Sequence, residues 1–505
     1  MSDTRFVSTA LRWFRNQLHV AALCPRGAAW LAQFRRRRAV GTGPDLLAFA
    51  ILQLTLTPSL ERAADFATDA VDGRLSRTLV AHRLATVSGE RAFSAFATEW
   101  AQYDQSLQRA VTLMAVAMDA PERRRRETLE SALDAVLEGA RERVVEFSAA
   151  IRGPAMGIYA FGVMLPLALV GLLPVLASSG GGVSTLALGI IYDLLIPVGL
   201  IGCALWLWGR RPAVTDTAFD VGLLDRARSP VYTFGAGVFG AALAGLPAHL
   251  LAPDWSIPIV AIGVGLGTAL IVGLQPVLEE VDRLDRLEAR LPDALSIVGQ
   301  RLGEGEPVET SIASVADRFD GPLGDLFVRA RTRQARSGEP MEAVFLGVDG
   351  LLNDVPSQRV RVGLSLTMTA GEYGGSGGET LHAVGTYLAE LLDVERAARR
   401  NLSQTTSTLR QTAVVFAPAI AGVTVALATG MKAVDGSGQP LDVAALGQVI
   451  GIYVLLLGAV LPSLSVVLAR GFDPVRMGFQ SGIALLVGAI VYPLSFVAAR
   501  TLVYV

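Results

Sequence analysis

The residue types that usually carry out chemistry in proteins do not gather into a set along this chain. Its four histidines and two cysteines lack the spacing of metal ligands or of a structural disulfide. No serine, cysteine or carboxylate pairs with a histidine in the way that a nucleophile pairs with its base. The sequence therefore predicts a protein that is not an enzyme and that uses no metal ion or cofactor.

A glycine-rich run, Gly371–Glu379 (GEYGGSGGE), is the nearest approach to a phosphate-binding loop. Such loops follow a strand and end in Gly-Lys-Ser or Gly-Lys-Thr, and neither feature is present in this stretch. We interpret the run as a flexible hinge between helices, where glycine permits close backbone approach and positive φ angles. The glycines of this hinge are Gly374, Gly375, Gly377 and Gly378.

Asp193 stands inside an apolar stretch, TLALGIIYDLLIPVGLIG. Placing an ionisable side chain at that depth of a membrane span costs free energy, so such a residue is first considered functional. A transporter or channel that uses Asp193 is therefore an alternative function, although the other apolar stretches offer no clear partner for it. The other interpretation is a carboxylate that packs against a neighbouring helix or a partly hydrated gap. Ile196–Pro197 predicts a kink just beyond it.

A charged stretch opens the polar region that begins at residue 277. Its acidic and basic residues recur three and four positions apart, which favours a solvated helix face with intrahelical salt bridges. These residues are Glu279, Glu280, Asp282, Arg283, Asp285 and Arg286.

The composition indicates a multispanning membrane protein, since 51% of the 505 residues are hydrophobic and the mean hydropathy is +0.45. A helix needs about 20 mostly apolar residues to cross a bilayer. We expect four spans between residues 154 and 276 and three between 412 and 505. The segments are 154–177, 185–208, 232–252, 256–276, 412–430, 444–469 and 479–499.

The basic residues predict the orientation of these spans. All of the 44 basic residues except Lys432 and Arg500 lie in four segments, 1–153, 209–231, 277–411 and 470–478. Short cytoplasmic loops are enriched in arginine and lysine, so we expect these segments and the N-terminus in the cytoplasm and the C-terminus outside. The net charge of −2 gives no general attraction to nucleic acid.

Leu291–Phe345 reads as several short helices that must pack on one another as a bundle, because each has a narrow apolar stripe. A stretch beginning at Pro44 follows the same order of breakers and stripes, so we predict two related all-α bundle domains, 44–153 and 277–411. Each domain ends in a long charged helix that leads into a span. The basic N-terminal extension, 1–43, is interpreted either as an amphipathic helix on the membrane surface or as an ordinary helical extension of the first domain.

The order LPDAL…GEPVETSIASVAD…GPLGDLF…SGEPMEAVF, followed by the glycine run and a long helix, resembles the cytoplasmic domain of the type II secretion system F-protein family. That family comprises polytopic platform proteins of secretion systems, type IV pili, tight-adherence pili and archaeal flagella. The two-domain form found among archaeal pilus-assembly proteins is the most similar. The resemblance covers roughly 277–430 well and 44–177 more loosely, and the first copy carries Pro121–Arg126 in place of the glycine run.

The resemblance implies an inner-membrane platform that performs no catalysis itself. It implies two partners, a hexameric secretion or pilus ATPase in the cytoplasm and pilin-like subunits in the membrane, and it is compatible with a homo-oligomer. Positions in the matching pattern are expected to contact a partner or to couple its motion, or else to serve only as helix caps and turns. They are Pro292, Asp293, Gly338, Glu339, Gly374, Gly375, Gly377 and Gly378.

Overall fold

The computed structural model describes residues 40–71, 73–86, 88–178, 185–211, 227–373, 375–434 and 442–503, and every regular element within them is a helix. Seven of these helices are long and apolar enough to cross a membrane, and each contains most of one predicted span. They are Glu122–Leu172, Leu186–Gly209, Pro230–Leu250, Asp254–Gly303, Gly377–Thr429, Val443–Arg470 and Pro474–Leu502. By length and composition the chain is therefore a multi-pass membrane protein.

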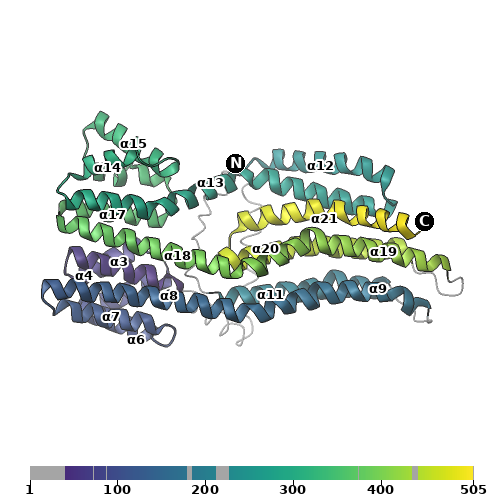
Figure 1. The fold of residues 1–505 in the computed structure, drawn as a ribbon, viewed down its shortest axis with the longest axis horizontal. Coiled ribbons are helices and arrows are strands. Elements are labelled where there is room, and N and C mark those ends of the chain that lie inside the picture. The colour runs from purple at the N-terminus through teal and green to yellow at the C-terminus, as the bar shows by residue number, and fades with distance from the viewer. Residues whose placement is uncertain are drawn as a thin grey trace.

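The molecule is elongated and has two halves (Figure 1). The bundle half contains short helices, and its core is one cluster of buried side chains drawn from residues 46–140 and 287–391. The apolar half contains the membrane-type segments, and its main core is a second cluster drawn from residues 147–499. The C-terminus lies at the end of the apolar half that is far from the bundles.

The first bundle contains six helices in chain order. They are α3 (Gly43–Leu56), α4 (Leu60–Ala70), α5 (Arg74–Ala85), α6 (Gly89–Trp100), α7 (Gln105–Met118) and the first part of α8 (Glu122–Tyr159). Side-chain caps begin two of them, because Ser59 accepts the N–H of Arg62 and Asp104 accepts the N–H of Ser106. Almost every residue of α3 is buried, as expected for a helix that is apolar on all sides. The apolar run Leu46–Leu56 thus belongs to the core of the bundle half.

The second bundle repeats this order of helices. It contains the end of α13 (Ile257–Gly303), then α14 (Val308–Ala316), α15 (Pro322–Ser337), α16 (Met341–Leu346), α17 (Gln358–Glu372) and the start of α18 (Gly375–Gln411). Gly73 and Gly321 occupy the same place, before α5 and α15, and both have positive φ angles. Gly89 and Gly338 differ, because Gly89 begins α6 whereas Gly338 has a left-handed conformation that ends α15.

Long helices run without interruption from the bundle half into the apolar half. They are α8, α13 and α18, and α13 alone contains 47 residues. The expected domain limits at 153, 276 and 411 therefore fall inside continuous helices rather than in linkers. Pro276 and Pro292 lie inside α13 and do not end it.

The apolar half is completed by α9 (Leu165–Ser178), α10 (Thr185–Gly189), α11 (Ile196–Arg210), α12 (Pro230–Leu251), α19 (Ala417–Val434), α20 (Val443–Arg470) and α21 (Pro474–Val503). Single π turns, η3 (Ala160–Met164), η4 (Ile190–Leu195) and η9 (Thr412–Phe416), precede Pro166, Pro197 and Pro418. Proline cannot donate a backbone hydrogen bond, and such turns accommodate the loss. The hydroxyl of Tyr453 donates to the carbonyl of Gly162, four residues before Pro166. The π turn η4 ends directly before Ile196–Pro197, and the kink expected at that pair stays a prediction.

Candidate functional site

The crossing of α13 and α18 in the second bundle depends on glycine. A Cβ atom on Gly299 would lie 2.8 Å from the carbonyl oxygen of Gly378, and a Cβ atom on Gly385 would lie 2.9 Å from that of Pro292. A Cβ atom on Gly378 would overlap the backbone of Gly303. Real side chains do not tolerate such distances, so these positions hold the two backbones in direct contact.

The predicted glycine hinge contributes to this crossing. Helix α17 ends at Glu372 and α18 begins at Gly375, so Gly375, Gly377 and Gly378 all lie in the first turn of α18. Gly374 lies outside the described residues. None of the described glycines of the run has a positive φ angle, whereas Gly377 faces the carbonyl of Ala370 too closely for a Cβ atom. Of the two reasons expected for glycine in this run, close approach is confirmed and positive φ is not.

Pro292 and Asp293 lie next to each other inside α13, and only Pro292 is buried. Pro292 is buried and its carbonyl faces Gly385. Asp293 is exposed, with Oδ2 3.9 Å from Nη1 of Arg290. The structure therefore brings Pro292 into the glycine crossing and leaves Asp293 on the surface.

Gly338 and Glu339 lie elsewhere in the second bundle, in the turn between α15 and α16. Glu339 is exposed, and its Oε2 lies 3.9 Å from Nε of Arg333. Gly338 caps the end of α15, since its N–H donates to the carbonyl of Gln334. Their hydrogen bonds and ion pair are to Gln334, Ser337 and Arg333, all within this part of the second bundle and away from the α13–α18 crossing.

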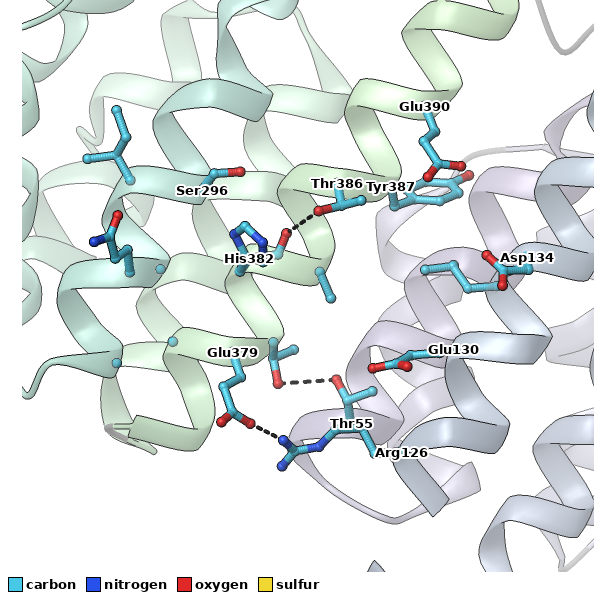
Figure 2. Close-up of a pocket in the computed structure, with 18 of the residues that line it drawn as sticks. Thr55, Arg126, Glu130, Asp134, Ser296, Glu379, His382, Thr386, Tyr387 and Glu390 are labelled. Atoms are coloured by element: carbon cyan, nitrogen blue, oxygen red, sulfur yellow. Dashed lines mark hydrogen bonds and ion pairs between the residues drawn. The ribbon is translucent and has the colours of Figure 1, made fainter. Parts of the chain in front are cut away.

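A cleft of about 820 Å³ separates the two bundles beside this crossing (Figure 2). One wall belongs to the first bundle and carries Thr55, Arg126, Glu130 and Asp134, while α13 and α18 form the other wall. Most of its charged side chains are acidic. The side chains of the α13–α18 wall are Ser296, Gln300, Glu379, His382, Thr386, Tyr387 and Glu390, among others.

Polar contacts bridge the cleft between α8 or α3 and α18. Arg126 pairs with Glu379, as Figure 2 shows, and the hydroxyl of Thr55 donates to that of Thr380 at 3.3 Å. Farther along α8, Nη2 of Arg141 lies 3.1 Å from Oε2 of Glu390. The two ion pairs, Arg126–Glu379 and Arg141–Glu390, are solvent-accessible, so each contributes little stability alone.

A buried ionic cluster lies deeper in the same interface. Its centre is Arg359 of α17, whose Nη2 is 2.7 Å from Oε1 of Glu395. Asp45 of α3 and Glu288 of α13 each approach the same guanidinium to 3.9 Å. Ser357 donates to Glu288 at 2.6 Å. The cluster therefore joins the first bundle to three helices of the second bundle.

Burial changes the acidity of this cluster. Burial raises the pKa of Asp45 above its ordinary value of 3.8, and Arg359 opposes that shift through its positive charge. Burial likewise raises the pKa of Glu288. Glu395, Asp45 and Glu288 together hold the pKa of Arg359 well above its ordinary value despite its burial. Several carboxyls thus compete for one guanidinium in an environment that disfavours charge.

A second ionic group lies where the bundles meet the apolar half. Arg476 lies 2.5 Å from Asp282 and 2.9 Å from Asp285, and it also pairs with Asp473. Arg470 lies 2.8 Å from Asp285. The predicted intrahelical face was therefore wrong for these two aspartates, because they bind Arg470 at the end of α20 and Arg476 in the first turn of α21. Glu280–Arg283 follows the predicted spacing.

The sequence contains a signal for these clusters, namely acidic residues on apolar helical stripes, although no known motif includes them. Glu288 precedes Leu291 by three positions, and Glu395 follows Leu391 by four, so each carboxylate continues an apolar helical stripe. An acidic residue on a stripe that faces the core requires a buried partner. Which arginine supplies it depends on the tertiary contacts alone.

Asp193 lies in η4 with Tyr192 buried beside it. Its Oδ1 atom is enclosed and has no hydrogen-bond partner among the described residues. No group of three or more histidine, cysteine or acidic side chains in the described part of the chain could hold a metal ion. Comparisons with protein-family models, with curated proteins and with solved structures found no match.

Proposed function

We propose that this chain is a platform protein of a type IV pilus-like or type II-like secretion machine. In this proposal the two repeated bundles are cytoplasmic and receive motion from a hexameric ATPase. The apolar half holds pilin-like subunits and inserts or extracts them. Energy comes from ATP that the partner hydrolyses.

The observation that carries the proposal is the continuity of α8, α13 and α18. Each spans about 50 residues from the bundle half into the apolar half, which corresponds to about 75 Å at 1.5 Å per residue. A helix is stiff over such a distance, so a rotation of the bundles displaces the apolar segments. A protein that converts a cytoplasmic motion into a movement inside the membrane requires this kind of connection.

The glycine crossing and the ionic clusters support the same function. The crossing holds α13 to α18, and Arg359 holds both to α3. Arg470 and Arg476 then attach α20 and α21 to α13. Motion received by either bundle is thereby distributed to several spans.

Deletion of the chain tests the proposal directly. We expect loss of surface filaments or of the secreted substrate, with pilin subunits retained in the membrane, and recovery when the full chain is restored. Full-length protein should also co-purify with the secretion ATPase of the same cell. Intact filaments and secretion after deletion would refute the platform function.

The orientation can be checked with the same strain. Cysteines placed in the bundles should resist a membrane-impermeant thiol reagent in intact cells, while a cysteine placed after Val503 should react. Labelling of the bundles from outside would contradict the predicted cytoplasmic location.

The unpartnered Oδ1 of Asp193 favours a transporter or channel as the second candidate function. In that case Asp193→Asn should abolish function at normal protein abundance by removing the charge. If Asp193 only packs against its neighbours in a platform protein, the same variant should retain much of its assembly activity.

A further inference from the structure

A second cavity, of about 470 Å³, lies among three long helices where the bundle half meets the apolar half. Its walls come from α13, from the end of α18 with the π turn η9, and from the first turns of α21. Leu278, Gln411 and Phe479 line it, and each lies within two residues of an expected end of a membrane span, at 276, 412 or 479. Three helices thus change from polar to apolar at the level of this cavity.

The lining of this cavity is polar towards the bundles and apolar towards the membrane. Arg410 and Gln411 end the polar helix α18, and Val415 lies about 8 Å further along the chain. Arg476 lies in the first turn of α21, and Ile483 lies about 10 Å further along that helix. Val415 and Ile483 are both exposed, so the cavity opens on the outer surface of the apolar half. The other lining residues are Leu278, Asp282, Val414, Phe479 and Gln480.

Arg410 is the cation of this cavity whose charge is not already balanced. Arg476 is buried and shared among three aspartates, one of which, Asp282, also lines the cavity. Arg410 is exposed and makes no ion pair within the described ranges. The side-chain amides of Gln411 and Gln480 add neutral donors at the same level. An anionic group at the bundle end of the cavity would therefore meet one unpaired guanidinium and two amides.

We propose that this cavity binds an anionic phospholipid from the leaflet next to the bundles, with its phosphate on Arg410 and its acyl chains along Val415 and Ile483. An amphiphile is required, because a soluble anion leaves the apolar end uncovered and an apolar molecule leaves the guanidinium without an acceptor. Basic pockets between membrane helices bind lipid headgroups in this way. The inference requires the membrane-type helices but not the platform function.

The charges of the cavity select an anionic headgroup over a zwitterionic one. A zwitterionic headgroup would bring its own ammonium group close to Arg410 and Arg476, and like charges disfavour each other. Asp282 does not attract that ammonium group strongly, because its carboxylate already lies 2.5 Å from Arg476. Phosphatidylglycerol and phosphatidylcholine with identical acyl chains therefore distinguish the two cases.

The test uses the purified full chain in neutral nanodiscs that contain a trace of a phospholipid with a photoreactive acyl chain. Its headgroup is phosphatidylglycerol in one sample and phosphatidylcholine in the other, and mass spectrometry maps the crosslinked peptides. We expect phosphatidylglycerol to label η9 and residues 474–483 roughly fivefold more than phosphatidylcholine does. This ratio corresponds to about 1 kcal/mol of attraction for one arginine at the membrane surface.

Variants of the arginine then test its role. Arg410→Gln should lower the labelling by phosphatidylglycerol roughly fivefold, whereas Arg410→Lys, which keeps the charge, should retain most of it. Arg400→Gln is the matched control, since Arg400 is also exposed on α18 but lies about 15 Å along the helix from Arg410. That distance exceeds the screening length of about 8 Å at physiological salt. Thermal unfolding midpoints verify that each variant is folded.

Each outcome decides the inference. Equal labelling by the two headgroups, or an undiminished preference in Arg410→Gln, overturns it. An equal loss in Arg400→Gln would show a general attraction to anionic membranes and likewise overturns the site. Excess inorganic phosphate should leave the labelling unchanged, and displacement of the lipid would assign Arg410 to a soluble anion instead. The platform function is tested separately, because it fails only if filaments and secretion survive deletion of the chain.

Discussion

At the scale of single residues, Arg359 connects more of the molecule than any predicted site residue. Its guanidinium faces Glu395, Asp45 and Glu288, which belong to three different helices. Glu395 also approaches Arg399 at 3.7 Å. Such a cluster adds little net stability compared with an apolar replacement of all its members, but removing one member leaves buried charge unpaired.

Arg359→Met should therefore destabilise the protein by about 3–5 kcal/mol, because it leaves several carboxylates without a cation. The measurement is the thermal unfolding midpoint of the purified full chain in detergent. Arg331→Met is the matched control, since Arg331 pairs with Asp317 at the surface and its loss should cost less than about 1 kcal/mol. Equal effects of the two variants would contradict the buried role of Arg359.

The raised pKa of Asp45 predicts a pH dependence of stability. The folded protein binds the proton of Asp45 more tightly than the unfolded chain does, because burial disfavours the carboxylate. The stabilising contribution is complete below the ordinary pKa of 3.8 and is lost as the pH rises through the raised folded value. Asp45→Asn mimics the protonated form, so it should flatten the decrease in unfolding midpoint that occurs as the pH rises above the ordinary pKa of 3.8.

Glu61 should contribute a pH dependence of stability opposite to that of Asp45. Its Oε1 accepts the N–H of Gly89 at 2.9 Å, which lowers the pKa of Glu61. Its contribution is therefore lost as the pH falls, the reverse of Asp45. An Asp45→Asn protein with the wild-type pH dependence would show that Asp45 is not responsible.

At the scale of elements, the contact between α13 and α18 determines how the second bundle moves. Glycines on both helices bring the backbones together, so the two helices behave as one unit rather than as rods separated by side chains. The glycine run at the start of α18 therefore acts as a close contact in this state. Its role as a hinge remains a prediction.

Gly378→Ala should separate the crossing, because the added methyl group overlaps the backbone of Gly303. Overpacking of this kind costs about 1–3 kcal/mol. Gly303→Ala is the matched control, since nothing lies within 4 Å of the position of its Cβ atom, and alanine is favoured over glycine in a helix. We expect a lower unfolding midpoint and reduced filament assembly only in Gly378→Ala. The same loss in both variants would show that close contact at Gly378 is not the cause.

At the scale of the whole molecule, the two bundles are not independent bodies. Their buried side chains form one continuous core, and α3 of the first bundle contacts α18 of the second. The apolar surface that each bundle buries against the other would be exposed in isolation. The two bundles are thus expected to fold and to move as one domain with two related halves.

Residues 277–411 produced alone should consequently aggregate or unfold, because the face that covers α3 loses its partner. Size-exclusion chromatography and thermal unfolding of this fragment provide the measurement, and the full chain in detergent is the control. A monomeric 277–411 fragment that unfolds cooperatively would mean that the shared core is dispensable.

Local patterns in the sequence determined the helices. The apolar stripes of Leu291–Ala330 predicted the buried faces of α13, α14 and α15, and the seven apolar segments predicted the membrane-type helices. Gly321 and Gly338 were recognisable as helix boundaries, because a glycine that ends a helix acts through its own backbone conformation. These features depend on residues within a few positions of one another.

Only the tertiary structure determined how distant charges pair and how the halves are joined. Asp282 and Asp285 could bind arginines of their own helix or those of α20 and α21, and spacing alone cannot distinguish these alternatives. Arg359 and Asp45 are separated by most of the chain, and their contact exists because one core encloses both bundles. The sequence alone determined the helices, because short-range sterics and periodic burial act between residues that are close along the chain. The tertiary structure determined the partners of the buried charges, because these depend on which helices pack together.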